Sequence, residues 1–259
     1  MNEKLKITPP PRVNKSLLKV AGQPIPAGLG ILKQSTFVPF FGNIEKANAC
    51  TISINPSFNE FRDSKGDILS DNKARLCSRK SLDKRDDEEL STDDAQKVYA
   101  ACLNYFQNNP YKRWFNKINR FIQDIDSELS YYDSTLVHLD LVQWATEKKW
   151  SECKPIQKEL LKICSPFLKE LLDQKKFNII FLNGQTVVNS FIEKISPLDE
   201  KEIVLKRDGK KATLYFGTYK GTRVVGWSRY LQSQISNEAV KELNHKVSKI
   251  LKEINQWNI

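Results

Sequence analysis

The sequence is poor in the side chains that build metal centres. It contains only two histidines, His138 and His245, and five scattered cysteines without a Cys-x-x-Cys pair. Zinc sites draw most of their ligands from clustered His and Cys residues, so a zinc hydrolase is poorly supported. Odd, dispersed cysteines predict reduced thiols that pack as small core residues in a cytoplasmic protein. We therefore expect neither a metal nor another cofactor.

Long apolar runs and glycine-rich loops are also missing. No stretch reaches the roughly 18–20 apolar residues that a membrane span needs. The polar segment Met1–Lys6 offers no secretory core, and no glycine loop is present to cradle a phosphate. The sequence thus predicts no membrane partner, and it disfavours an α/β hydrolase that acts on nucleotides or other small molecules.

Positive charge is what the sequence has in excess. Lys and Arg number 41 against 31 Asp and Glu, which gives a formal net charge of +10. Such a field attracts polyanions, so nucleic acid is the first partner to expect. Lysines that only keep a protein soluble are the alternative. The chain, at 259 residues, is long enough for one large domain, and we expect a monomer.

The chain divides by composition into an arm and a body. Residues 1–30, rich in Pro, Gly and Lys, predict an extended N-terminal arm. Residues 31–259 predict a single α/β domain, and the mixed charges around 62–90 indicate a surface insertion within it.

Strands alternate with helices along the body. Apolar, β-branched runs predict strands, and apolar residues at helical spacing predict helices. The expected strands lie at 49–54, 135–142, 177–182, 213–216 and 223–225, and the expected helices at 95–106, 110–125, 155–164, 166–172, 187–192 and 240–254. The capping box Ser91–Asp94 begins the first helix, and Ser165 caps a separate helix at Pro166. This order predicts a three-layer αβα sandwich with a mostly parallel central sheet.

The most informative segment is the turn that ends the first strand. Ala49–Ile54 is apolar and β-branched, and Pro56 ends the strand because proline has no backbone N–H to donate. Asn55 and Ser57 therefore lie at the carboxyl end of a strand, where open α/β sheets bind ligands. An ordinary Asn-Pro turn, in which Asn55 only caps the adjoining residues, is the alternative.

The order of five segments resembles the uracil-DNA glycosylase superfamily. Ser53–Ser57 is similar to the Gly-Ile-Asn-Pro-Gly motif of its mismatch-specific branch, and Asn109–Phe115 to the Asn-Arg-Phe-Trp segment beside that branch's base pocket. Leu136–Val142 lies where the family has a strand that ends in a base-reading Asn. Cys164–Leu168, followed by Ile179–Gly184, is similar to the Cys-x-Pro-x-Leu helix and Leu-Gly strand of the thermophile-type branch.

The fifth segment, Gly226–Leu231, falls at the family's DNA-wedging loop, and the resemblance spans roughly residues 40–232. Trp227 precedes Ser228 where the family often has His or Asn, so no imidazole is expected there to stabilise a departing base. Some thermophile-type members carry an iron–sulfur cluster on four cysteines. Cys153 and Cys164 echo two of them, but without an N-terminal pair we expect no cluster.

The resemblance implies roles for three polar residues of these segments. Asn55 would align the attacking water, which needs little activation when the sugar is oxocarbenium-like. Asp140 replaces the base-reading Asn, and an ionised carboxylate that only accepts hydrogen bonds suits the exocyclic amine of a cytosine-type base. A loop cap, or an ion pair with Lys or Arg, is the alternative. His138 shares its strand face and would donate to the base or to a phosphate, unless it is a core histidine. Asn183 is a further pocket candidate.

Aromatic residues are expected to stack on an extruded base. Trp114, Phe115 and Tyr111 are the first candidates, and Phe58 and Phe61 the second. Packing in the core is the alternative for each ring.

The remaining candidates would contact the rest of the DNA. Arg229, Tyr230 and Leu231 are expected to fill the gap left in the duplex, since wedges are commonly apolar or long side chains. Ser57 and Ser228 are expected to hold phosphates.

Together these features predict a metal-independent DNA glycosylase. It would flip a deaminated or modified pyrimidine, hydrolyse the N-glycosidic bond and leave an abasic site without strand cleavage. Base-excision repair is one setting. Defence against phage DNA with modified cytosines is another, because the superfamily includes anti-phage members. The alternative is a non-catalytic module that senses damaged or single-stranded DNA.

Overall fold

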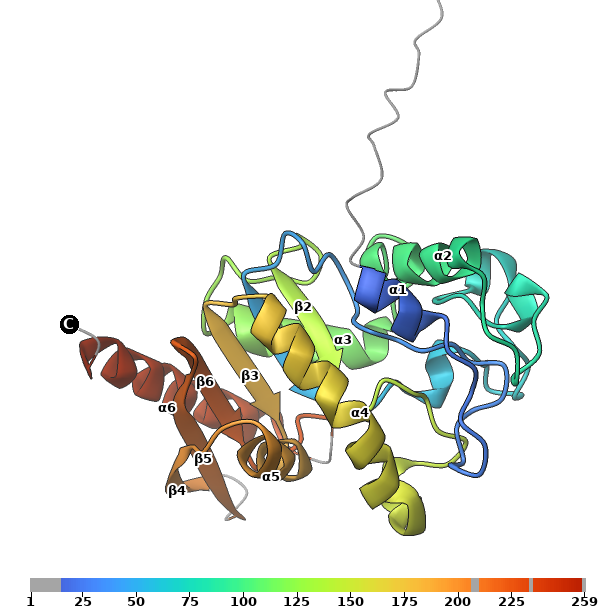
Figure 1. The fold of residues 1–259 in the computed structure, drawn as a ribbon. Coiled ribbons are helices and arrows are strands. Elements are labelled where there is room, and N and C mark those ends of the chain that lie inside the picture. Colours follow the sequence, from blue (N-terminus) through green and yellow to red (C-terminus); the bar gives the residue numbers. More distant parts are fainter. Residues whose placement is uncertain (1–14, 206–209, 233–234, 258–259) are drawn as a thin grey trace, which may run out of the picture.

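A six-stranded mixed sheet organises the chain (Figure 1). The computed structural model describes residues 15–205, 210–232 and 235–257. The strands are β1 Ala49–Ser53, β2 Leu136–Asp140, β3 Ile179–Asn183, β4 Asp199–Leu205, β5 Lys210–Tyr219 and β6 Thr222–Trp227. They lie in the order β2-β1-β3-β6-β5-β4, with β2, β1, β3 and β6 parallel and the last two pairings antiparallel. The predicted α/β class and mostly parallel sheet are confirmed.

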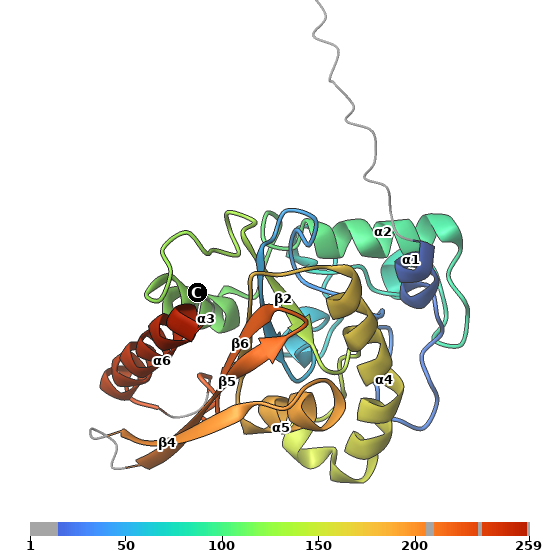
Figure 2. The ribbon, with the colours of Figure 1, turned by 60° about the vertical axis from the view of Figure 1, so that its left-hand side comes forward.

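Helices cover both faces of this sheet. In Figure 2, α3 and α6 lie on one side of the strands, and α4 and α5 on the other. The helices are α1 Lys15–Ala21, α2 Thr92–Leu103, α3 Lys112–Gln123, α4 Lys154–Gln174, α5 Gln185–Lys194 and α6 Asn237–Trp257. This arrangement is consistent with the three layers expected from the sequence.

The strand register brings the carboxyl ends of four strands to one edge. β1 runs parallel to β2 on one side and to β3 on the other. Ser53 pairs with Asp140 in the first ladder, and Asn183 pairs with Trp227 where β3 meets β6. The polar residues that end these strands therefore lie close together. Open α/β sheets bind their ligands at this place, outside the carboxyl ends of the strands.

The local signals at strands and caps account for most of these elements. Every residue of β1, β2 and β3 is buried, as expected of strands with helices on both faces. The Ser91 hydroxyl accepts a hydrogen bond from the Asp94 backbone N–H, which confirms the predicted cap of α2.

Two elements differ from the expectation. Residues 155–172 were expected to form two helices, but α4 is continuous and contains Pro166 in its interior. The proline removes one N–H from the helix, while the Ser165 hydroxyl donates to the Leu161 carbonyl instead of capping a new helix. β4 was not predicted, because only Ile203 and Leu205 of its residues are buried.

The segments expected to be an arm and an insertion pack against the body. Residues 1–14 of the arm lie outside the described residues, whereas Lys15–Ala21 forms α1, with Leu17 and Ala21 buried in the core. The segment 62–90 is irregular, with the short 3₁₀ helices Asp71–Lys73 and Lys80–Leu82. Arg79 anchors it from within, since its buried guanidinium donates to the carbonyls of Gln23, Arg85 and Glu88.

None of the helices in the described ranges combines the length and the apolar composition that crossing a membrane requires.

Candidate active site

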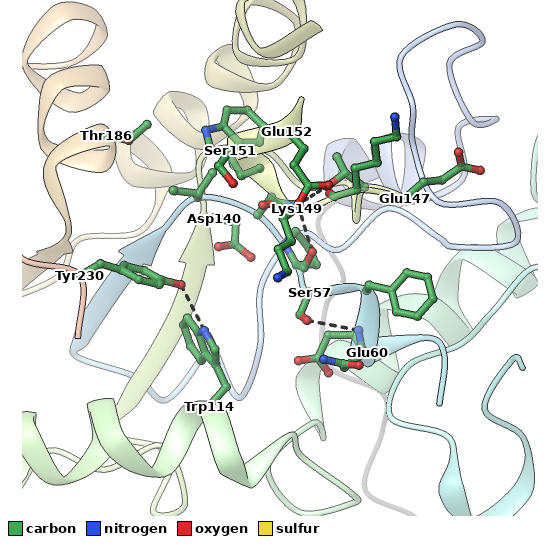
Figure 3. A pocket seen from close by; sticks show the side chains of 18 of the residues that line it. Ser57, Glu60, Trp114, Asp140, Glu147, Lys149, Ser151, Glu152, Thr186 and Tyr230 are labelled. Carbon is green, nitrogen blue, oxygen red and sulfur yellow. Dashed lines mark hydrogen bonds between the residues drawn. The ribbon is translucent and has the colours of Figure 1, made fainter. Parts of the chain in front are cut away.

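A cleft of about 1010 Å³ opens where β1 and β2 end (Figure 3). This volume lies near the upper limit of the roughly 300–1,000 Å³ typical of small-molecule sites. Eight residues predicted from the sequence line it: Asn55, Ser57, Phe58, Trp114, Phe115, His138, Asp140 and Tyr230. The sequence thus located the cleft, and the geometry decides what each residue does there.

Asn55 keeps an acceptor available after its amide nitrogen has been used. Nδ2 donates to the Thr146 Oγ1 (3.2 Å) and to the Trp144 carbonyl (3.4 Å). The Thr146 hydroxyl gives its proton to the Lys148 carbonyl (2.7 Å), so it can only accept from Asn55. These partners fix the orientation of the amide and leave Oδ1 without a donor among the described residues. Asn55 therefore holds the adjoining loop, as the simpler interpretation has it, and it also lines the cleft.

Asp140 is a buried acid whose acceptors are unused. It is 2% exposed, and neither carboxylate oxygen has an aligned hydrogen-bond donor among the described residues. No described Lys or Arg pairs with it, so the ion-pair alternative is wrong for the described chain. His138 Nε2 lies 3.4 Å from Oδ1. Burial raises the pKa of Asp140, and His138 opposes this rise. A buried acceptor without a donor costs free energy, so this position suits a ligand that brings its own N–H groups.

His138 connects Asp140 to a buried chain of hydroxyl groups. Its Nδ1 lies 2.7 Å from Thr51 Oγ1, which in turn lies 2.5 Å from the Tyr131 hydroxyl. Burial raises the pKa of Tyr131 well above its usual value, so Tyr131 stays protonated and can donate to Thr51. Thr51 can then donate to Nδ1, and the other ring nitrogen, Nε2, is the one that faces Asp140. His138 is 2% exposed and packed among rings, so it orients Asp140 from within the core.

Aromatic rings form other walls of the cleft. Trp114 projects from α3 and donates its Nε1–H to the Tyr230 hydroxyl (3.2 Å) (Figure 3). Phe58 and Trp150 line the cleft from two 3₁₀ helices, Phe58–Glu60 and Trp150–Glu152. Phe115 is 2% exposed and packs among core rings, so it backs the cleft from behind. Trp114, Phe58 and Trp150 are thus half-buried rings in the cleft lining that a ligand can contact.

Tyr230 lines the cleft because a glycine lets it approach. Gly184 begins α5 with a φ of +105°, which side chains other than glycine rarely adopt. A Cβ at this position would lie only 3.2 Å from Cδ2 of Tyr230. Burial raises the pKa of Tyr230 to about 12, so its hydroxyl keeps its proton. The ring belongs to the pocket wall, and its role as a wedge stays a prediction.

Glu60 is a site residue that the sequence did not reveal. It is 2% exposed, lines the same cleft and accepts a hydrogen bond from the Tyr105 hydroxyl (2.6 Å). Burial raises the pKa of its carboxyl to about 8, against the lowering effects of Tyr105 and Arg75. The one sequence signal was an acid between Phe58 and Phe61, and that pattern does not indicate burial.

Several predicted site residues are structural instead. Asn183 is fully buried: its amide donates to Ser53 Oγ (3.3 Å) and Gln232 Oε1 (3.0 Å), and its oxygen accepts from Trp227 Nε1 (3.1 Å). It ties the ends of β1, β3 and β6 together and does not line the cleft. Leu231 is also fully buried and cannot enter a duplex from this position.

The other corrections concern residues with partners of their own. The Ser228 hydroxyl accepts from the Thr213 backbone (2.9 Å), so it supports strand pairing. Tyr111 does not line the cleft, and its hydroxyl accepts from Asn59 (3.2 Å). Phe61 is buried in the core. Arg229 is half-buried and outside the cleft lining. The Ser57 hydroxyl caps the 3₁₀ helix Phe58–Glu60 at the cleft wall.

Charged residues crowd one wall of the cleft. Lys148, Lys149 and Lys154 line it together with Glu147 and Glu152, all from the segment around the 3₁₀ helix Trp150–Glu152. In the described ranges no ion pair involves any of the three lysines. This wall therefore offers cations to an anionic ligand.

The chain matches no known protein family and no curated protein. The site must therefore be interpreted from its own geometry. Within the described ranges, no three His, Cys, Asp or Glu side chains gather as they would around a metal ion. Cys153 and Cys164, the pair compared with cluster ligands, are both buried free thiols.

Proposed function

We propose that this protein is a DNA glycosylase that hydrolyses the N-glycosidic bond of a base turned out of the helix. One observation carries the proposal: Asn55 and Asp140 line a single cleft, Asn55 Oδ1 accepts no hydrogen bond from a described residue, and neither Asp140 oxygen has an aligned donor there. A water molecule would donate a hydrogen bond to the Asn55 oxygen, and the exocyclic amine of a base would donate to the Asp140 carboxylate. Both lie where open α/β sheets bind ligands.

The walls of the cleft support an extruded base as the ligand. The rings of Trp114, Phe58 and Trp150 offer faces for stacking, which contributes about 1–3 kcal/mol per base in proteins that bind single strands. Asp140 would accept from an amine of the base, which favours a cytosine-type pyrimidine, including modified cytosines. Asn55, held by Thr146, would align the water. Alignment is the main contribution that a neutral amide can make.

DNA as the polymer is supported by charge. The net charge of +10 and the lysines at the cleft wall would attract a phosphate backbone. Repair of damaged bases and defence against phage DNA with modified cytosines both fit a monomeric enzyme of this kind. Hydrolysis would leave an abasic site.

Release of free bases from DNA tests the proposal. Genomic DNA with unmodified, deaminated and hypermodified pyrimidines is incubated with the protein, and mass spectrometry identifies the released bases. We expect one pyrimidine class to be released. Asn55→Ala should slow its release at least about 100-fold, whereas Asn189→Ala, on the exposed face of α5, should not.

The alternative function gives a different result. A non-catalytic DNA-binding module would bind the same DNA in a salt-dependent way, and no base would appear over hours. That outcome, or full activity of Asn55→Ala, would overturn the proposal.

A further inference from the structure

Glu60 has no part in the mechanism proposed above, although its carboxyl is buried in the wall of the same cleft. No ion pair to it is formed by a described residue. The charge of Arg75 lowers the pKa of Glu60 without a direct hydrogen bond, because Arg75 Nε and Nη1 donate to the Asn59 and Asn109 carbonyls. Buried acids are usually paired, because an isolated charge loses its hydration. An unpaired one in a cleft is a candidate for proton transfer.

The hydrogen bonds around Tyr105 fix where the proton of Glu60 resides. The Tyr105 oxygen accepts from the Tyr111 backbone N–H (2.8 Å), so its own proton is donated to Glu60 Oε2 (2.6 Å). Burial keeps Tyr105 protonated, because it raises the pKa of the phenol well above its usual value. When Glu60 is neutral, its proton is therefore on Oε1. That oxygen has no hydrogen-bond partner among the described residues.

We propose that Glu60 is the general acid that protonates the departing base, and that the cleft therefore serves cytosine-type bases, which leave poorly as anions. The inference rests on the proposed glycosylase function. Asp140 and Glu60 come from different elements, β2 and the 3₁₀ helix Phe58–Glu60, and both border the central space in Figure 3. One offers acceptors to an amine, and the other offers a proton to a ring nitrogen.

The proton balance of the step is complete without a further reactant. The Glu60 Oε1–H bond breaks, and its proton moves to N3 of the base. The bond from C1′ to N1 breaks, and its electron pair stays on the base, which leaves neutral. The water aligned by Asn55 forms the new bond to C1′, and the proton that it loses returns the Glu60 carboxylate to its acid form through the solvent.

The surroundings of Glu60 keep it in the acid form at neutral pH. Burial and, to a lesser extent, the charge of Asp140 raise its pKa, Tyr105 and Arg75 lower it, and the net value is about 8. The other titratable groups lining the cleft are His138, Tyr230, Glu147, Glu152 and the three lysines 148, 149 and 154. An acid with a pKa near the working pH is best suited to general acid catalysis.

The pH profile of base release tests the proposal. Single-turnover release is measured from about pH 6 to about pH 9.5 on duplexes that carry a cytosine-type substrate base or uracil. We expect the wild-type rate on the cytosine-type base to fall about tenfold per pH unit above the Glu60 pKa. Glu60→Gln, which is isosteric and cannot donate a proton from oxygen, should release this base at least about 100-fold more slowly at pH 7 and with a flat profile. Uracil leaves more readily as an anion, so its release should depend less on Glu60.

A second variant separates proton transfer from folding. Tyr105→Phe keeps the Glu60 carboxyl but removes a hydrogen bond that lowers its pKa, so the alkaline fall in rate should move to higher pH. Thermal unfolding checks that each variant is folded. A wild-type rate with an unchanged alkaline limb in Glu60→Gln would overturn the role of Glu60 while the glycosylase function stands. No base release by the wild type would instead overturn the proposed function itself.

Discussion

The neighbours of Asp140 determine which hydrogen bonds its carboxylate can still accept. His138, Thr51 and Tyr131 form a chain of close polar contacts behind it, and the cleft lies in front of it. The protein supplies the carboxylate with an electrostatic partner but no aligned donor among the described residues. In the proposed function, an acceptor left open in this way would select among bases by their amines, since a base without one leaves the buried acceptor unsatisfied.

Replacement of Asp140 by asparagine should change which base is released. The amide can donate to O4 of uracil and accept from its N3–H, whereas an ionised carboxylate only accepts. We expect Asp140→Asn to lower the ratio of released cytosine-type base to uracil by about 10–100-fold, the discrimination typical of one well-placed base contact. Mass spectrometry of bases from matched duplexes measures the ratio, with Asp199→Asn on β4 as the control. An unchanged ratio would show that Asp140 does not read the base.

At the scale of elements, α3 presents a different surface on each side. Phe115, Ile118, Phe121 and Ile122 are buried against the sheet, while Trp114 enters the cleft. The basic residues Arg113, Lys117 and Arg120 recur at helical spacing away from this core, and no described carboxylate forms an ion pair with them. The helix contains no acidic residue. If the proposed function holds, its basic side would suit the phosphates that flank an extruded base.

Removing cations from α3 should weaken DNA binding and its salt dependence together. For Arg113→Ala combined with Lys117→Ala, we expect the slope of log affinity against log salt to become shallower by about 0.9 for each phosphate that is no longer neutralised. Fluorescence anisotropy across a salt series measures both quantities. Lys201→Ala with Lys211→Ala, at the far edge of the sheet, is the matched control and should leave the slope unchanged. Equal slopes for both double variants would remove α3 from the interface.

The sequence was most informative where short-range rules decide the structure. The buried strands β1 and β2 and the parallel-strand rule placed Asn55 and Asp140 at one edge, and the Ser91 cap gave the start of α2. It failed where distant contacts decide. Asn183 and Leu231 were predicted to contact DNA, but the fold buries both. Glu60 becomes a site residue only because Tyr105 and Asp140, distant in the sequence, come to lie near it.

For the whole molecule, the buried acid of the cleft couples folding to pH. Glu60 keeps its proton in the folded state up to a pH of about 8, against 4.5 as its ordinary value. Between these values the folded protein binds more protons than the unfolded chain, so the free energy of unfolding falls as the pH rises. The raised pKa of Asp140 acts in the same direction.

Glu60→Gln should therefore be relatively more stable than the wild type in alkaline solution. As the pH rises from 4.5 to about 8, the variant should gain stability relative to the wild type. The gain in the free energy of unfolding should reach up to about 1.4 kcal/mol per pH unit. Urea unfolding at about pH 5.5 and about pH 8.5 measures it. Glu200→Gln, at an exposed position of β4, is the control and should show no such growth. A constant difference for Glu60→Gln would mean that its carboxyl titrates alike in both states.

The outermost strand of the sheet has a consequence for how copies of this chain behave at high concentration. β4 begins Asp199-Glu200-Lys201-Glu202, and all four residues are exposed. A bare strand edge invites another molecule to continue the hydrogen-bond ladder, but charges of this kind would have to shed their hydration to allow it. The charged residues of β4, at the end of the sheet opposite the cleft, thus disfavour the edge-to-edge pairing of molecules that leads to fibres.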